Sequence, residues 1–354
     1  MPISDEPFAD TGPTRPAPRP SRRRAPLTTA MCALYVLLII AVLVVMRLMG
    51  EQWWVATLLL FSPRWVWALP AIVLLPMAVL YHRRLAFPVA LAAATVLFSV
   101  MGFRIPWRRA LPAGTPHETL RVFTCNLHGR SAKPTLLEEL VGESRPDVIL
   151  LQDYTAAREP SIVRAEQWYS DRYDGTFIAS RYPLHRMENM LPRDGSALAY
   201  ASHGWPLGDA ICYTLELPGG PIHLINLHLA SPHQQLDAIE ERKDGASDAL
   251  DADSARRTFE SLMIAARAQQ IGGPFVIAGD FNTPDDSPLF GEAWHNFDDA
   301  FNTAGFGFGT TYSNHHTWLR IDHILCNPTW RCAACWVGPP IGSGHRPVVA
   351  VLEH

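Results

Sequence analysis

The sequence predicts an α/β domain of two packed β-sheets with helices outside, preceded by a membrane-spanning region. From about residue 119, short apolar runs alternate with polar loops marked by Gly and Pro, which predicts many strands and few helices. In the first hundred residues, the apolar runs are instead long enough to cross a bilayer. These two patterns divide the chain.

The first 26 residues are rich in Pro, Arg and Ser and predict a disordered basic tail. The next 20 residues, 27–46, carry no charge and would span a hydrocarbon core of about 30 Å as a helix. A cleaved signal peptide is the alternative, because basic residues precede the run. The run is long for such a peptide and is followed by further apolar segments, so we expect an uncleaved helix.

Two further transmembrane spans are predicted at residues 65–81 and 85–103, and the short piece 53–61 is expected at the membrane interface. The tail and the loop between the second and third spans hold seven arginines, against five on the other side. This bias predicts a multi-pass protein of the cell membrane whose C-terminal domain lies outside the cytoplasm. A transporter is a poor alternative, because the spans contain no acidic residue.

Residues 104–118 are expected to form a linker, and the α/β domain is expected at 119–354. Twelve arginines and four acidic residues lie in the first 109 positions, which leaves 18 basic and 30 acidic residues, a net charge of −12, for the rest. Such a domain binds polyanions poorly, because that affinity comes mostly from Lys and Arg at phosphates. Tight nucleic-acid binding is therefore disfavoured, although a local basic groove stays open as an alternative.

The spacing of the six cysteines does not predict a particular set of disulfides or a metal site. Cys326, Cys332 and Cys335 cluster near the C-terminus, and a lone Cys-x-x-Cys is a weak zinc signal. A disulfide within this cluster and free buried thiols both remain open.

Eight strands and two helices are predicted in the α/β domain. The strands are expected at 120–126, 148–152, 175–179, 210–216, 223–228, 275–278, 321–326 and 348–352, and the helices at 134–143 and 254–270. Residues 231–253 are polar, charged and aperiodic, so a long mobile loop is expected there.

Polar side chains follow several of these predicted strands. Asp280 and Asn282 come after the apolar run 275–278 and would point the same way, because side chains alternate along an extended strand. The other polar groups at strand ends are Asn126, Asp153, His228, Asp322 and His345. Each has a structural alternative as a turn former, a helix cap, a core histidine or a surface charge.

In this order, the blocks resemble the endonuclease/exonuclease/phosphatase superfamily, which includes DNase I-like nucleases, abasic-site endonucleases, inositol-polyphosphate phosphatases and neutral sphingomyelinases. The resemblance covers about residues 119–354. It is most specific in Gly-Asp-Phe-Asn at 279–282, Arg-Ile-Asp-His-Ile-Leu at 320–325 and His-Arg-Pro-Val at 345–348. It implies a four-layer α/β sandwich that hydrolyses phosphate esters with a divalent metal ion.

The resemblance also implies a metal site and two substrate contacts. Asn126 and Asp153 match metal-binding positions, Asp153 standing where the family usually has Glu. Hard oxygen donors of this kind suit Mg²⁺ or Mn²⁺. The segments around Arg181 and Trp318 also resemble family blocks, so these two side chains are expected to contact substrate.

The remaining residues would carry the chemistry. The resemblance implies that Asp280 orients or deprotonates the attacking water and that Asn282 hydrogen-bonds the phosphate. His345 would stabilise the transition state, and Asp322 would fix its tautomer and favour its cationic form. His228 would contact the phosphate or protonate the leaving oxygen.

One position departs from the family pattern. The last family block is normally Ser-Asp-His, whereas this chain has Ser343-Gly344-His345, so a carboxylate that helps to hold metal is missing. We expect weaker metal binding, and a two-metal arrangement is disfavoured, although the number of metal ions stays open.

The leading hypothesis is a membrane-anchored, metal-dependent phosphoesterase for a phosphodiester that is lipid or otherwise surface-associated, with no obligate protein partner. The alternatives are an extracytoplasmic nuclease and a catalytically degenerate module that binds a phosphorylated ligand.

Overall fold

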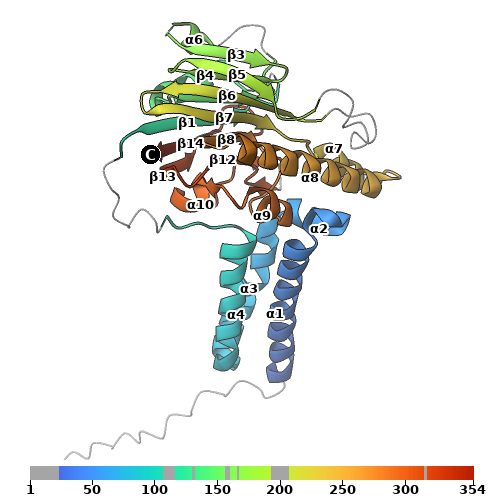
Figure 1. Ribbon diagram of the computed structural model, residues 1–354. Helices are drawn as coiled ribbons and strands as arrows, with labels where there is room; N and C mark the ends of the chain where they lie inside the picture. The colour runs from blue at the N-terminus through green and yellow to red at the C-terminus, as the bar shows by residue number, and fades with distance from the viewer. Residues whose placement is uncertain are drawn as a thin grey trace, which may run out of the picture.

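The computed structural model describes residues 24–106, 116–129, 132–155, 160–165, 167–192, 207–314 and 317–354. A bundle of long helices projects from one side of an α/β domain (Figure 1). Most of the expected tail and of the expected linker lies outside the described residues.

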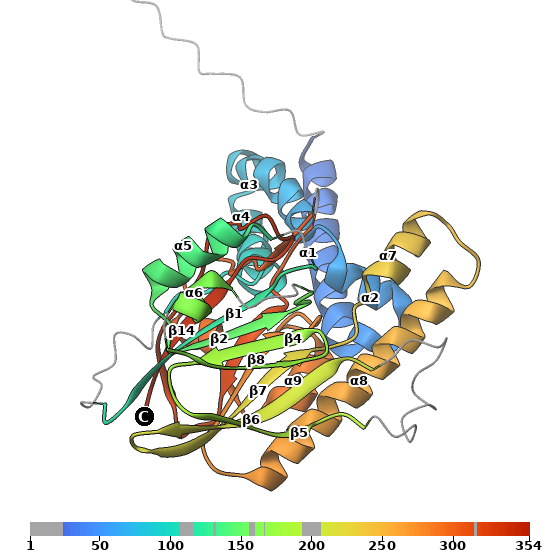
Figure 2. The ribbon, with the colours of Figure 1, turned by 90° about the horizontal axis from the view of Figure 1, so that it is seen from above.

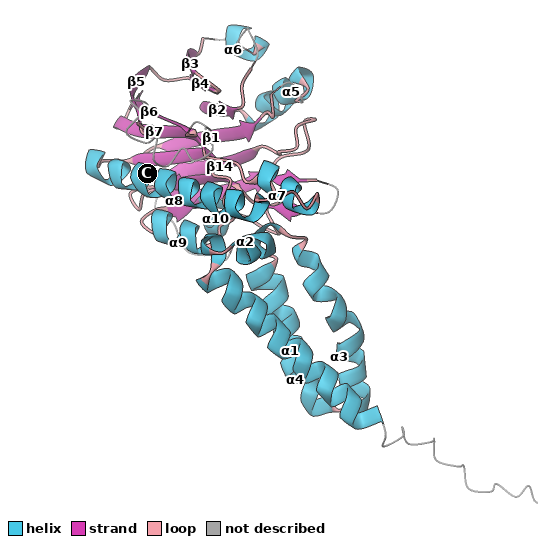
Figure 3. Ribbon diagram, turned by 90° about the vertical axis from the view of Figure 1, so that its right-hand side faces the viewer, coloured by secondary structure: helices cyan, strands magenta, loops and turns pink. Residues whose placement is uncertain are grey.

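Three stretches of the helical bundle are long and apolar enough to cross a membrane, and they overlap the three predicted spans. They are Pro26–Leu48, Arg64–Tyr81 and Arg83–Val100. The elements that form the bundle are α1 (Arg24–Leu48), η1 (Gly50–Gln52), α2 (Trp54–Phe61), η2 (Arg64–Ala68), α3 (Leu69–Tyr81), α4 (Arg83–Thr95) and η3 (Val96–Val100). The bundle leaves the domain beside α2 and α9 (Pro288–Trp294), and the N-terminal end of α1 lies far from the domain (Figures 1 and 3).

Two six-stranded sheets form the centre of the α/β domain. The first has the order β13-β14-β1-β2-β4-β3, and the second has the order β5-β6-β7-β8-β12-β9. The strands of the first sheet are β1 (Thr119–Asn126), β2 (Val148–Gln152), β3 (Tyr169–Tyr173), β4 (Thr176–Ser180), β13 (Arg331–Val337) and β14 (Val348–Glu353). Those of the second are β5 (Leu184–Asn189), β6 (Asp209–Leu217), β7 (Gly220–His228), β8 (Phe275–Asp280), β9 (Asp298–Asp299) and β12 (Asp322–Cys326). A small separate ladder pairs β10 (Tyr312–Ser313) with β11 (Trp318–Leu319).

Helices cover the outer faces of both sheets. The helices of the domain are α5 (Pro134–Ser144), α6 (Ser161–Ala165), α7 (His233–Glu240), α8 (Ala246–Ile271), α9 and α10 (Ala300–Ala304). Figure 2 shows α5 and α6 on one side of the strands and α8 on the other. The described residues therefore form the predicted four-layer α/β sandwich.

Alternating side chains explain the layers. On β8, Val276 and Ala278 enter the core between the two sheets, whereas Phe275 and Ile277 pack in the outer core with α8 and α9. Strands that are apolar on both faces must be covered on both faces. The continuous apolar run before Asp280 is thus the reason that β8 is central.

The expectation of a mobile loop at residues 231–253 is wrong. This segment forms α7 and the first two turns of α8, with Gly245 in a left-handed conformation (φ 75°) at the start of α8. Leu236 packs against a hydrophobic cluster that joins the helical bundle to Leu319 and Ile321, and Leu250 is fully buried. Most of the other side chains are polar, so the helical period is weak in the sequence.

Arginines of the bundle hold the loop that follows β8. Arg64 Nη1 lies 2.9 Å from Asp286 Oδ2, and Arg104 Nη2 lies 2.7 Å from Asp285 Oδ2. Arg47 donates to the main-chain oxygen of Asp286 at 2.6 Å. The bundle is therefore attached directly to the chain segment that begins with Asp280. The expected linker is also fixed at its start, because Arg104 pairs through its main chain with Gly307.

All six cysteines are buried, and Cys326, Cys332 and Cys335 form no disulfide with one another.

Candidate active site

The predicted polar residues lie at one edge of the two sheets because of the strand directions. β1 runs parallel to β2, with Asn126 beside Gln152, and β7 runs parallel to β8, with His228 beside Asp280. β12 is antiparallel to β8, so Asp322 at its beginning lies beside Asp280. The C-terminal ends of β1, β2, β7 and β8 and the N-terminal end of β12 therefore lie on the same side of the two sheets.

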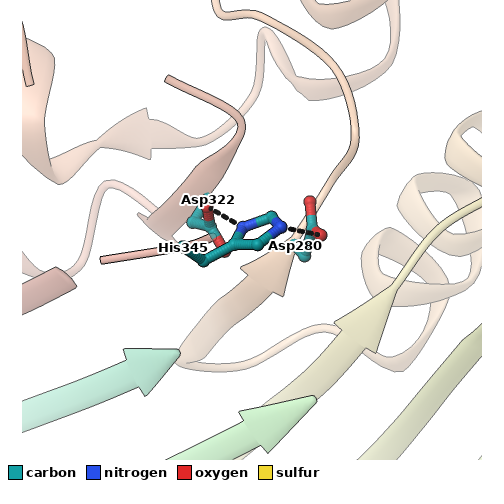
Figure 4. Close-up of side chains that lie close together, drawn as sticks. All are labelled: Asp280, Asp322 and His345. Carbon is teal, nitrogen blue, oxygen red and sulfur yellow. Dashed lines mark hydrogen bonds and ion pairs between the residues drawn. The ribbon is translucent and has the colours of Figure 1, made fainter. Parts of the chain in front are cut away.

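His345 is held between two carboxylates (Figure 4). Its Nδ1 lies 2.9 Å from Asp322 Oδ2, and its Nε2 lies 3.7 Å from Asp280 Oδ2. Burial lowers the pKa of His345, but the nearby Asp322 and Asp280 outweigh this effect and raise the pKa from 6.5 to about 9. The imidazole is therefore a cation at neutral pH.

Asn126 links the two sheets at the site. Its Nδ2 donates to Asp280 Oδ2 at 2.9 Å, and its Oδ1 accepts from the main-chain nitrogen of His128 at 2.8 Å. Ser343 fixes the adjoining loop, because its Oγ donates to the main-chain oxygen of Asn126 and accepts from the main-chain nitrogen of His345. These bonds leave Asn126 and His345 little rotational freedom.

His228 and Asp153 form the more open side of the site. His228 Nδ1 lies 3.4 Å from Asp153 Oδ1, and His228 Nε2 lies 3.7 Å from Asp280 Oδ2. The Asp153 side chain is 42% exposed, whereas that of Asp280 is 1% exposed. Asp153 can therefore meet an incoming ion or ligand, and Asp280 forms the floor.

Asn282 is at the site but is anchored within the protein. Its Nδ2 donates to the main-chain oxygen of Leu229 at 2.8 Å, and its main-chain nitrogen donates to Asp280 Oδ1 at 2.9 Å. The residue has φ 48°, a left-handed conformation that asparagine tolerates better than most residues. The main-chain nitrogen of Asn282 thus positions Asp280, while its side-chain amide is bonded to Leu229; the expected contact of this amide with phosphate stays a prediction.

A cleft of about 580 Å³ lies over these groups. Its lining includes Asn126, Asp153, His228, Asp280, Asn282 and His345, together with His128, His233 and Tyr312, which the sequence analysis did not single out. The Tyr312 ring centroid lies 4.9 Å from that of His345 and 4.4 Å from that of His233. Burial lowers the pKa of His233 to about 4, although Asp280 opposes the shift, so this imidazole is neutral at pH 7.

The two expected substrate contacts do not line this cleft. Arg181 follows β4 at the end of the sheet where Val148 begins β2, and its guanidinium stacks on Trp168 at 4.4 Å from the ring centroid. Trp318 lies on β11, is 58% exposed and lines a separate pocket with Trp65 and Phe308. Arg181 is thus at the opposite end of the sheet from the cleft, and Trp318 lines a pocket outside it, so their contact with substrate stays a prediction.

The donors at the open side suit a hard divalent cation. Asn126 Oδ1 retains one lone pair beside its bond to His128, and the exposed Asp153 carboxylate accompanies it in the cleft. Oxygen donors that leave most positions to water are typical of Mg²⁺.

Potential ligand atoms of Asp280, Asp322 and His345 also lie within 4.8 Å of one another. A protonated imidazole, however, has no lone pair to offer a metal and already offsets the carboxylate charge. The oxygens of Asn126 and Asp153 could therefore hold such an ion better than this group could.

Gly344 leaves room for the carboxylate that the family pattern would place there. A Cβ at this position would lie 3.4 Å from Tyr312 Cε2 and 3.6 Å from His128 Nδ1, which are ordinary contacts. The backbone here is outside the left-handed region. His128 therefore stands next to the space where an aspartate side chain would begin.

The two packed sheets, with Asn126, the His345–Asp322 pair and the buried Asp280 at one edge, form a four-layer α/β sandwich that carries a polar, acid- and histidine-containing site. The sequence profile of the Endonuclease/Exonuclease/phosphatase family matches residues 123–344, and the chain belongs to this family. Hydrolysis of phosphate esters is the activity of that class.

Several solved structures resemble the chain. An endonuclease/exonuclease/phosphatase from Beutenbergia cavernae is 17% identical, with a TM-score of 0.49 over 67% of this chain and 72% of that one. A humanized D. rerio TDP2 is 16% identical, with a TM-score of 0.49 over 67% and 99%. The 3′ phosphatase NExo from Neisseria, bound to a product DNA hairpin, is 16% identical, with a TM-score of 0.46 over 65% and 98%. No curated protein matches the chain in sequence. At these identities, the structural likeness concerns the fold alone.

Proposed function

We propose that this chain is a membrane-anchored, divalent-metal-dependent phosphoesterase that hydrolyses a phosphodiester by attack of water. The observation that carries the proposal is the His345 imidazolium between Asp322 and Asp280 on the floor of the cleft. It combines a fixed positive charge with a buried carboxylate, and phosphoryl transfer needs both groups in one place. The arginine distribution supports an extracytoplasmic position of the domain in the cell membrane.

The proposed mechanism assigns one task to each group. Asp280 Oδ2 accepts a proton from the attacking water, and Asn126 and Asn282 hold this carboxylate in place. His345 stabilises the charge that grows on the phosphoryl oxygens. His228, half-open to the cleft, donates a proton to the leaving oxygen. A Mg²⁺ or Mn²⁺ ion held by Asn126 and Asp153 would polarise a phosphoryl oxygen.

The charge of the cleft favours a compact phosphodiester over a nucleic acid. Its described lining contains the carboxylates of Asp153, Asp209, Asp237, Asp253 and Asp280, but one arginine, Arg256, and no lysine. Arg256 is itself paired with Asp253 at 3.0 Å. A strand of phosphates gains affinity mainly from contacts with Lys and Arg, and this lining holds no lysine and one arginine that is already paired. We therefore propose a lipid phosphodiester as the substrate class.

The first experiment assays the full chain in detergent micelles on an aryl phosphodiester, a phospholipid and duplex DNA, with Mg²⁺ and with chelator. We expect metal-dependent turnover, highest on the phospholipid and lost in His345→Ala. Turnover highest on DNA would favour a nuclease. A folded protein silent on all three substrates would contradict the phosphoesterase proposal and favour a binding module.

Replacement Gly344→Asp should strengthen metal binding about 10-fold, because it adds a carboxylate beside the open site without a steric clash. The measurement is direct Mn²⁺ binding by electron paramagnetic resonance, which does not depend on turnover. Gly344→Asn is the matched control, since it adds similar volume without charge, and it should leave the affinity nearly unchanged. Equal affinities in all three proteins would show that position 344 does not reach the metal.

A further inference from the structure

Exposed aromatic side chains gather on one face of the α/β domain. Seven large apolar residues of the described domain are exposed; five of them are aromatic, and four of these five are Phe306, Phe308, Trp318 and Trp336. Phe306, Phe308 and Trp336 line one groove, and Phe308 and Trp318 line the pocket beside it. We call these four residues the aromatic face. The other three, Tyr169, Met187 and Leu262, are elsewhere on the domain.

The aromatic face is continuous with the end of the helical bundle. The Phe103 ring follows the third apolar stretch and lies 5.5 Å from that of Phe306 and 5.1 Å from that of Phe308, measured between centroids. Trp65, at the start of the second stretch, lines the same pocket as Phe308 and Trp318. Each headgroup layer of a bilayer is about 5 to 8 Å thick. Rings this close to the helix ends therefore fall within that layer if the bundle spans a membrane.

The domain is also fixed in this orientation. Arg64 and Arg104 bind Asp286 and Asp285, and Arg64 additionally donates to the main-chain oxygen of Val100 at 3.0 Å. These bonds tie the bundle ends to the loop after β8, so the domain is held against them. An exposed aromatic patch on a tethered domain would be costly in water but is typical of a membrane–water interface.

We propose that the aromatic face rests in the headgroup layer of the bilayer and presents the catalytic cleft to phospholipid headgroups. The cleft is close to this level, because Tyr312 lines the cleft and also packs against the bundle cluster that includes Leu319 and Ile321. Leu236 of α7 packs against the same cluster. This inference rests on the membrane anchoring in the proposed function and extends it to the position of the substrate.

The test places spin labels on the full chain in phospholipid nanodiscs and measures their accessibility to oxygen and to a water-soluble nickel chelate. Phe306→Cys reports the aromatic face, and Met187→Cys, on the edge strand β5, is the control for water. Leu37→Cys, exposed in the middle of α1, is the control for hydrocarbon. The six native cysteines are buried.

We expect the label at position 306 to be shielded from nickel at least 5-fold relative to position 187, and less deep than position 37. A label at 306 as accessible to nickel as that at 187, with position 37 still in hydrocarbon, would overturn the inference and leave the anchoring intact. Nickel access at all three positions would overturn both the inference and the membrane part of the proposed function.

Discussion

Asp280→Asn should lower kcat for phosphodiester hydrolysis about 10³-fold, because it removes the group that accepts the proton of the attacking water. The carboxylate is 1% exposed and accepts from Asn126 Nδ2 and from the main-chain nitrogen of Asn282. The isosteric amide keeps the volume but cannot act as a base. Steady-state rates on the aryl phosphodiester give kcat, and thermal unfolding checks that the variant folds.

Asp171→Asn is the matched control for this change. Asp171 forms an exposed ion pair with Arg186 between the edge strands β3 and β5, and it is not part of the cleft lining. We expect its kcat to stay within about 2-fold of the original, because an exposed pair contributes little. An Asp280→Asn enzyme that stays folded and keeps more than a tenth of the rate would remove Asp280 from the mechanism.

The central strands were predictable because a strand that is buried on both faces is apolar along its whole length. Both β2 and β8 are continuous apolar runs that end at a polar residue; β2 has the predicted bounds, and β8 continues two residues beyond its predicted end. The edge strands of both sheets, β3, β5, β9 and β13, were missed. β3 is Tyr-Ser-Asp-Arg-Tyr, half exposed, and it is a strand because β4 pairs with it along its whole length. Such pairing is a long-range property that no local period reports.

The site was predictable to the extent that its residues follow strands. Asn126, His228 and Asp280 end strands and Asp322 begins one. Parallel pairing of β7 with β8 and antiparallel pairing of β12 with β8 place His228 and Asp322 beside Asp280, and Asn126 reaches Asp280 from the other sheet. His233 lies on α7 and Tyr312 on the two-residue strand β10, where Tyr312 is held beside Leu319 and His345, so no strand end marks either residue in the sequence. Arg181 and Trp318 resemble family blocks, but resemblance does not report side-chain direction. The sequence therefore predicted the polar residues at the strand ends better than the other residues that line the cleft.

The pH profile of kcat should fall on the alkaline side near pH 9 if His345 acts as a cation. Its pKa is about 9 in the folded protein, against 6.5 ordinarily, so the imidazole is protonated at neutral pH and loses its charge as the pH rises through about 9. The positive charge on His345 also contributes to the free energy of unfolding, and this contribution decreases as the pH rises. It is fully present below about pH 6.5 and is lost as the pH rises through about 9.

Asp322→Asn should move the alkaline limb to lower pH and lower kcat at neutral pH by about 10²-fold. Burial alone lowers the pKa of His345, and Asp322 is the strongest of the groups that raise it, through its charge and its hydrogen bond to Nδ1. Without this carboxylate, burial has more weight and the cation is lost at a lower pH. The measurement is the pH dependence of kcat in Asp322→Asn and in the unaltered protein.

His323→Gln separates this effect from a general loss of stability. His323 is also buried and also pairs with an aspartate, since its Nδ1 lies 2.8 Å from Asp299 Oδ2, but its Nε2 lies 3.1 Å from the main-chain oxygen of Thr283 and it does not line the cleft. This variant should unfold at a lower temperature and keep the alkaline limb near pH 9. If Asp322→Asn and His323→Gln gave the same limb, the His345 cation would not be the group that controls the rate, and the charge on the floor of the cleft would serve stability instead.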